Sequence, residues 1–168
     1  DREQAAAVDR DQGLGGGDTL TANGTAVGIN AGALADGSVY VSSAGSISAT
    51  SVYGDAYGIR AVTAGLGDIE VDNSGSITAT GYDFANGVAA WAYGDGAASV
   101  TNSGSIDVTG YTAIGVYAWT DGYGDASVTN TGTGSITATG YYATGILAVS
   151  NDAGNSNVTN DGTVSATG

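Results

Sequence analysis

The sequence predicts an all-β fold, a parallel β-helix (β-solenoid) of about five coils, with three short strands in each coil of 28–30 residues. Two observations predict this fold. The phrase Gly-Ser-Ile, or its variant Gly-Thr-Val, recurs with its central residue at steps of 30, 29, 30 and 28 residues. Apolar and polar residues alternate around the phrase, which is typical of strands. The central residues are Ile47, Ile77, Ile106, Ile136 and Val164.

The first 22 residues differ from the rest of the chain. Residues 1–12 carry two of the three arginines, and residues 13–17 are rich in glycine. We expect residues 1–22 to form a flexible or capping N-terminal arm and residues 23–168 to form the repeat domain. The length is that of one domain.

Each repeat is divided into three predicted strands. The first covers 46–50, 76–80, 105–109, 135–139 and 163–167. The second follows a glycine and covers 58–62, 87–91, 115–119 and 145–149, with an incomplete copy at 28–31. The third covers 98–102, has copies that end at Asn73, Asn130 and Asn160, and is represented by 38–43 early in the chain. An antiparallel sandwich is the alternative, but it would not need like residues at the same slot of every copy.

Composition excludes several classes of function. The chain has 17 acidic residues against three arginines, a net charge of −14, and no cysteine or histidine. This charge disfavours nucleic-acid partners and anionic membrane surfaces. No apolar run approaches the roughly 18 residues of a membrane span, so we expect no membrane insertion by this chain.

Stacking would align two sets of polar residues. Because asparagine tolerates turns and hydrogen-bonds its own kind, a structural ladder is expected at one corner. Its members are Asn73, Asn102, Asn130 and Asn160. The outward row of the first strand is similar to the ice-contacting face of solenoidal antifreeze proteins, but departs from it at Ser48, Asp107 and Ser165. The candidate ice-binding residues are Thr50, Thr78, Thr80, Thr109, Thr137, Thr139 and Thr167.

The outward row of the second strand is apolar and aromatic. We expect it to be an interaction face for a sugar or another protein, unless loops cover it. Its members are Trp91, Tyr117, Trp119, Leu147 and Val149, and Tyr82, Tyr111, Tyr141 and Tyr142 in adjoining loops would extend it.

Acidic residues gather in the loops after the second strand. Asp95, Asp121 and Asp125 are weak candidates for calcium ligands, because their spacing matches neither the calcium-binding nonapeptide nor an EF-hand loop, and solvation is the simpler explanation. No other cofactor is indicated. Without histidine, cysteine or lysine, and with no distinct carboxylate pair, we expect no enzymatic activity.

The phrase Val-Thr-Asn-Ser-Gly-Ser-Ile at 100–106, followed by Gly-Tyr-x-Ala-x-Gly at 110–115 and 140–145, resembles the passenger repeats of bacterial autotransporter and related secreted adhesins. The resemblance covers roughly residues 38–168. It implies secretion to the cell surface or beyond, a β-helical stalk, and a role in adhesion, self-association or biofilm formation.

The chain begins without methionine or a signal peptide and ends partway through a repeat. We therefore expect either a fragment of a longer protein or a subunit that stacks head to tail into a fibre. The predicted function is that of a non-catalytic extracellular structural or adhesive solenoid. Its expected partners are itself, a host or cell-surface receptor, or a glycan. The alternative is an ice-binding or carbohydrate-binding module.

Overall fold

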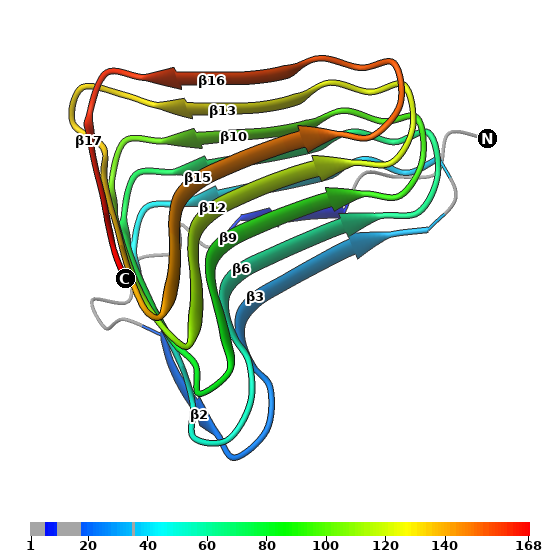
Figure 1. The fold of residues 1–168 in the computed structure, drawn as a ribbon. Helices are drawn as coiled ribbons and strands as arrows, with labels where there is room; N and C mark the ends of the chain where they lie inside the picture. The colour runs from blue at the N-terminus through cyan, green and yellow to red at the C-terminus, as the bar shows by residue number, and fades with distance from the viewer. Residues whose placement is uncertain (1–5, 10–17, 35) are drawn as a thin grey trace.

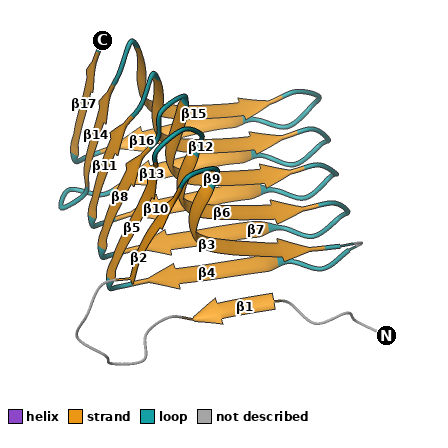
Figure 2. Cartoon of the chain, turned by 90° about the horizontal axis from the view of Figure 1, so that it is seen from below, coloured by secondary structure: helices purple, strands orange, loops and turns teal. Residues whose placement is uncertain are grey.

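The computed structural model describes residues 6–9, 18–34 and 36–168, and it is a β-solenoid built from three parallel sheets (Figures 1 and 2). Each coil gives one strand to each sheet, so strands that are neighbours in a sheet lie about one repeat apart in sequence. All pairings are parallel, which confirms the predicted solenoid over the antiparallel sandwich. None of the described residues forms a helix long and apolar enough to cross a membrane.

The three sheets are named A, B and C. Sheet A contains β1 (Ala6–Asp9), β4 (Val39–Ser43), β7 (Ile69–Asn73), β10 (Ala98–Asn102), β13 (Ala126–Asn130) and β16 (Ser156–Asn160). Sheet B contains β2 (Asp18–Ala22), β5 (Ser46–Ser51), β8 (Ser76–Thr80), β11 (Ser105–Thr109), β14 (Ser135–Thr139) and β17 (Thr163–Thr167). Sheet C contains β3 (Ala26–Ala33), β6 (Ala56–Thr63), β9 (Phe84–Ala92), β12 (Thr112–Thr120) and β15 (Tyr142–Ser150).

The core is a column of small aliphatic side chains between the three sheets. The register pairs Ile47 with Ile77, Ile77 with Ile106, and Ile106 with Ile136, so the repeated phrase stacks on itself. Sheets A and C add valine, isoleucine and alanine to the same buried cluster. One coil cannot bury its own apolar face, so each coil depends on its neighbours.

Sheet C differs from the prediction in length and shape. Its strands are eight or nine residues long, and each one turns through a bend (Figure 1). The pairing of neighbouring strands is interrupted at the glycine that precedes the inward residue, as at Gly58, Gly87 and Gly115. A β-carbon on Gly87 would collide with Cγ2 of Ile106 in the core. Glycine therefore lets the sheet fold closely over the core, and the bend makes the outer side of sheet C concave.

The four asparagines that end β7, β10, β13 and β16 form a hydrogen-bonded ladder. Nδ2 of Asn73 donates to Oδ1 of Asn102 over 2.8 Å, Asn102 donates to Asn130 over 2.9 Å, and Asn130 donates to Asn160 over 2.8 Å. Asn102 and Asn130 are fully buried. The ladder fixes the corner between sheets A and B because each carboxamide bonds to the next coil.

Two strands lie within the predicted 1–22 arm. β1 pairs with β4 and β2 pairs with β5, so the ladders of sheets A and B begin before residue 23. The remainder of the arm, residues 1–5 and 10–17, lies outside the described residues. The described part of the arm therefore belongs to the solenoid.

Candidate functional site

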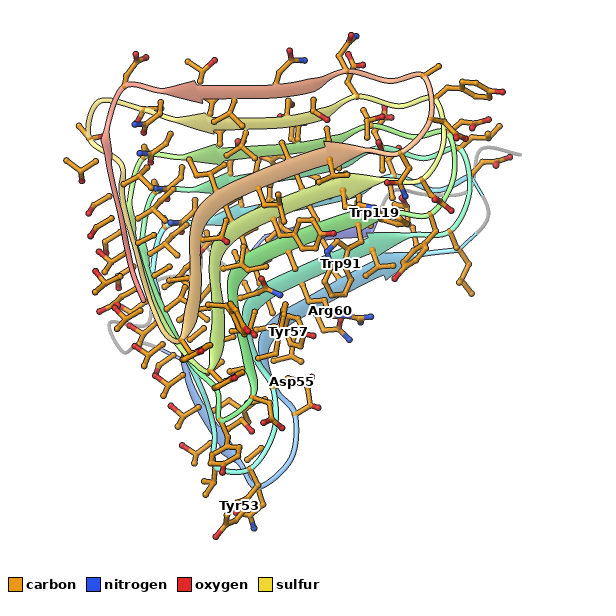
Figure 3. All side chains as sticks on the ribbon, in the orientation of Figure 1. Tyr53, Asp55, Tyr57, Arg60, Trp91 and Trp119 are labelled. Carbon is orange, nitrogen blue, oxygen red and sulfur yellow. The ribbon has the colours of Figure 1, made fainter. Side chains whose placement is uncertain are left out.

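The predicted interaction face occupies the concave outer side of sheet C. Trp91 pairs with Trp119 and Trp119 with Val149, so these three residues form one row across the sheet. Tyr117 and Leu147 form the next row. All five side chains are partly exposed. Figure 3 shows Tyr57, Arg60, Trp91 and Trp119 projecting from this side of the sheet.

Edge-to-face contacts connect the aromatic rings on this face. The ring of Trp91 lies 5.8 Å from that of Tyr57 and 6.1 Å from that of Tyr117, and Trp119 lies 5.0 Å from Tyr93. Trp91, Tyr93, Tyr117 and Trp119 line an open groove of about 360 Å³, which we call the aromatic groove. Each such ring pair adds about 0.5–1.5 kcal/mol beyond its buried area, so the ring contacts stabilise this closed arrangement of the groove.

Three residues form the floor beneath these rings. Asn86 and Ala89 are fully buried and Ile114 is 7% exposed, yet none of them belongs to the core cluster between the sheets. They alternate with the inward residues of β9 and β12 and therefore face the concave outer side. The rings of this face lie over the floor, and the stripe itself stays partly exposed, so the alternative in which loops cover it does not apply.

Asn86 and Trp91 contain the unpaired polar atoms of this site. Both carboxamide atoms of Asn86 are buried without a hydrogen-bond partner, and so is Nε1 of Trp91. Sequence reasoning named Trp91 but missed Asn86, Tyr57 and Tyr93. Asn86 precedes the bend glycine, a slot that holds Val27, Tyr57, Ile114 and Thr144 in the other coils, and its carboxamide beside the aromatic row was the available sign.

Arg60 lies at the edge of the face. Its guanidinium carbon is 5.4 Å from the centre of the Trp91 ring, and its Nη1 donates to Oδ1 of Asn30 over 3.2 Å. Both the Trp91 ring and the Asn30 side chain therefore interact with the Arg60 guanidinium, since aromatic faces attract guanidinium groups. The charge of Arg60 is engaged by these two contacts and is not free to attract an anion.

Two tyrosines of the face have raised pKa values. Burial, helped by the charge of Asp55, raises the pKa of Tyr57, and burial, helped by Tyr93, raises the pKa of Tyr117. In both cases loss of water disfavours the phenolate more than the phenol. The hydroxyl groups of Tyr57 and Tyr117 therefore stay protonated and able to donate hydrogen bonds.

We expect these two tyrosines to ionise above the usual pKa of a tyrosine in an alkaline titration followed by phenolate absorbance. Tyr57→Phe and Tyr117→Phe should each remove part of the late absorbance rise. Because the folded state holds these two phenolic protons more tightly, the contribution of Tyr57 and Tyr117 to stability should be constant below pH 10.0, the ordinary pKa of tyrosine, and fall as the pH rises past it. A late phase unchanged in both variants would contradict the assignment.

The other predicted aromatic residues form a separate exposed column at the corner between sheets B and C. The rings of Tyr111 and Tyr141 stack in parallel 5.2 Å apart, and Tyr142 contacts both edge-on. Tyr82 is also exposed. Among the described residues, no ring contact joins this column to the aromatic groove.

The carboxylates proposed as calcium ligands accept hydrogen bonds from the next coil. Oδ1 of Asp95 accepts from the backbone N–H of Tyr123, and Oδ1 of Asp121 accepts from Nδ2 of Asn151. Oδ1 of Asp125 accepts from both the backbone N–H and Nδ2 of Asn155, over 2.6 and 3.0 Å. Within the described ranges, no group of three or more metal-binding side chains gathers. These contacts give the loop acids a structural role in coil stacking.

Replacing Asp125 by alanine should therefore lower the free energy of unfolding by about 1 kcal/mol, the usual value of an exposed, charge-assisted contact of this kind. The loss should be the same in calcium and in a chelator, measured by urea unfolding. If calcium instead stabilised the wild type relative to the chelator and had no effect on the variant, Asp125 would be a calcium ligand.

The outer face of sheet B contains an unbroken row of threonines. Thr21, Thr50, Thr80, Thr109, Thr139 and Thr167 pair in succession through all six strands. The parallel row contains Thr78 and Thr137 and is interrupted by Ser48, Asp107 and Ser165. The structure thus places all the candidate ice-binding residues on one face.

No family model, curated protein or solved structure matches this chain. The resemblance to autotransporter passenger repeats therefore stays a prediction, and the functional argument depends on the site itself.

Proposed function

We propose that this chain is a non-catalytic adhesive solenoid of the cell surface or extracellular space, and that the aromatic groove is its contact surface. The observation that carries the proposal is the cluster of partly exposed rings on the concave side of sheet C. Exposed aromatic clusters of this kind mark interaction sites. The rigid, repetitive stack supports a role as a spacer that displays this groove, and the acidic composition supports solubility outside the cell.

Coupling the chain to beads tests this function. Beads should be retained on a layer of cultured epithelial cells, or should cluster with one another, and Trp91→Ser combined with Trp119→Ser should reduce that retention or clustering at least about tenfold, the loss expected from truncating central anchors. The control is Tyr53→Ser combined with Tyr141→Ser, which removes two exposed rings outside the groove. Equal adhesion by both double variants would overturn the proposal.

Self-association along the solenoid axis belongs to the same proposal. In β16 and β17, Val158 and Val164 are 52% and 40% exposed, whereas their partners Val128 and Ile136 are each 1% exposed. A further coil, from whichever chain, would bury these side chains and pair the strand edges. Negative-stain microscopy over a concentration series should then show threads of uniform width, and separate short rods at every concentration would count against end-to-end assembly.

Ice binding is the second candidate, supported by the unbroken threonine row of sheet B. A flat, regularly spaced row of hydroxyl and methyl groups on strands is the feature that supports this candidate. Thermal hysteresis that is lost in Thr109→Tyr, at the middle of the row, would support it. Freezing behaviour identical to that of an inert protein would exclude it.

A further inference from the structure

The carboxamide of Asn86 is the least explained group in the described part of the chain. It is fully buried, and neither its oxygen nor its nitrogen has a hydrogen-bond partner. A buried polar group left unpaired costs about 1–3 kcal/mol. Valine occupies the same slot at Val27, so an apolar residue fits the strand. A buried carboxamide without hydrogen bonds, at a position where valine would also fit, requires an explanation.

The unpaired atoms lie beside the aromatic groove. Asn86 pairs with Tyr57, whose ring contacts Trp91, and the indole N–H of Trp91 is itself buried and unpaired. Arg60 and Tyr117 also contact the Trp91 ring and flank Ala89 in register, so the indole lies over Ala89. With the rings moved aside, the site would combine aromatic walls with the acceptor and donor of the Asn86 carboxamide and the indole N–H of Trp91. Apolar walls with a few convergent polar groups, in a volume of this size, characterise small-ligand sites.

We propose that the aromatic groove binds a neutral oligosaccharide of β-linked glucose type, and that Asn86 and the indole N–H of Trp91 bind its hydroxyl groups. This inference rests on the proposed function, in which the groove is the contact surface. A glucose ring with equatorial hydroxyls presents C–H groups on both faces and hydroxyls around its edge. Its faces fit the aromatic walls. Its hydroxyls donate and accept, and thus match a carboxamide together with an indole N–H.

Charge selects a neutral ligand over an anionic one. The chain has a net charge of −14, and the charge of Asp55 adds to burial in raising the pKa of Tyr57. Such a field lowers the local concentration of anions. Arg60, the cation at the groove, is already held by Trp91 and Asn30. A wholly apolar ligand would leave Asn86 unpaired, so it would gain nothing from the polar atoms.

Binding requires a movement of the Trp91 ring. The polar atoms are covered in the free protein, and we expect the small side chain of Ala89 to leave room for a ligand once the indole turns outward. The ligand would then stabilise an open arrangement that is a minor one without it. In that arrangement the ligand supplies the hydrogen bonds that Asn86 and Trp91 lack.

Intrinsic fluorescence tests the proposal directly, because the chain has two tryptophans and both line the groove. Titration with cellopentaose should give a saturable change in emission, and an oligogalacturonate of equal length should give none. Asn86→Val should weaken cellopentaose binding at least about tenfold, the equivalent of losing one buried hydrogen-bonding group. Asn86→Val should nevertheless be at least as stable as the wild type in urea, because it removes unpaired polar atoms.

Thr144→Val is the matched control. It makes a polar-to-valine exchange in the same outward row one coil beyond Ile114, outside the groove, and should leave cellopentaose binding unchanged. No cellopentaose binding, binding of the oligogalacturonate alone, or undiminished affinity in Asn86→Val would each overturn the inference. Destabilisation by Asn86→Val would also overturn it, since Asn86 would then serve the fold. If beads still adhere through Trp91 and Trp119 while cellopentaose fails to bind, the inference falls and the proposed function stands.

Discussion

Replacing Gly87 by alanine should lower the free energy of unfolding by about 3 kcal/mol, at the upper end of the usual cost of overpacking. The added β-carbon would meet Cγ2 of Ile106 inside the core and lie 2.5 Å from the backbone oxygen of Gly115 in the next coil. The isoleucine methyl group can move only into a filled column, and the carbonyl is fixed by the strand ladder. The substitution should also flatten the bend of sheet C and separate the rings of the groove.

Urea unfolding measures the first effect, and tryptophan emission measures the second. The matched control is Gly45→Ala, because a β-carbon at Gly45 has no atom within 4 Å. We expect that control to change stability by less than about 1 kcal/mol. Similar stabilities of the two variants would mean that the close approach at Gly87 does not hold the bend.

The fold could be predicted because each coil repeats its inward residues. Ile47, Ile77, Ile106 and Ile136 differ from their neighbours in sequence but are identical to one another, which makes sense only if they stack. The same reasoning placed Asn102 and Asn130 at one corner. The repeat spacing therefore predicts both the coil length and the register of strand pairing. A shift of one strand by one residue would turn its core side chains outward.

The bend of sheet C and the floor of the groove could not be predicted in this way. A glycine before the second strand indicated a turn, and nothing in the period showed that the strand continues through it. Because the strand bends, Tyr57 and Trp91 meet across the concave face although they belong to different coils and different rows. Asn86 was overlooked because its slot holds a different residue in every coil, so the repeat says nothing about it.

Replacing Asn102 by alanine should cost about 3 kcal/mol, the second large effect expected for this chain. Asn102 accepts from Asn73 and donates to Asn130 and to the carbonyl of Gly104, all within a buried corner. Alanine removes these bonds and leaves the neighbouring carboxamides partly unpaired in a buried site. Urea unfolding followed by circular dichroism checks the loss.

Two further variants show whether the ladder or the local turn is responsible. Asn160→Ala removes the exposed end of the ladder and should cost clearly less than Asn102→Ala, because water replaces its partner. Ser43→Asn should stabilise the chain by about 1 kcal/mol. Ser43 pairs with Asn73, whose Oδ1 is buried and unpaired, and a new carboxamide below it would supply the missing donor. A gain in stability in Ser43→Asn would mean that a further carboxamide can extend the ladder by one coil. A loss in stability would contradict the ladder as the source of the effect.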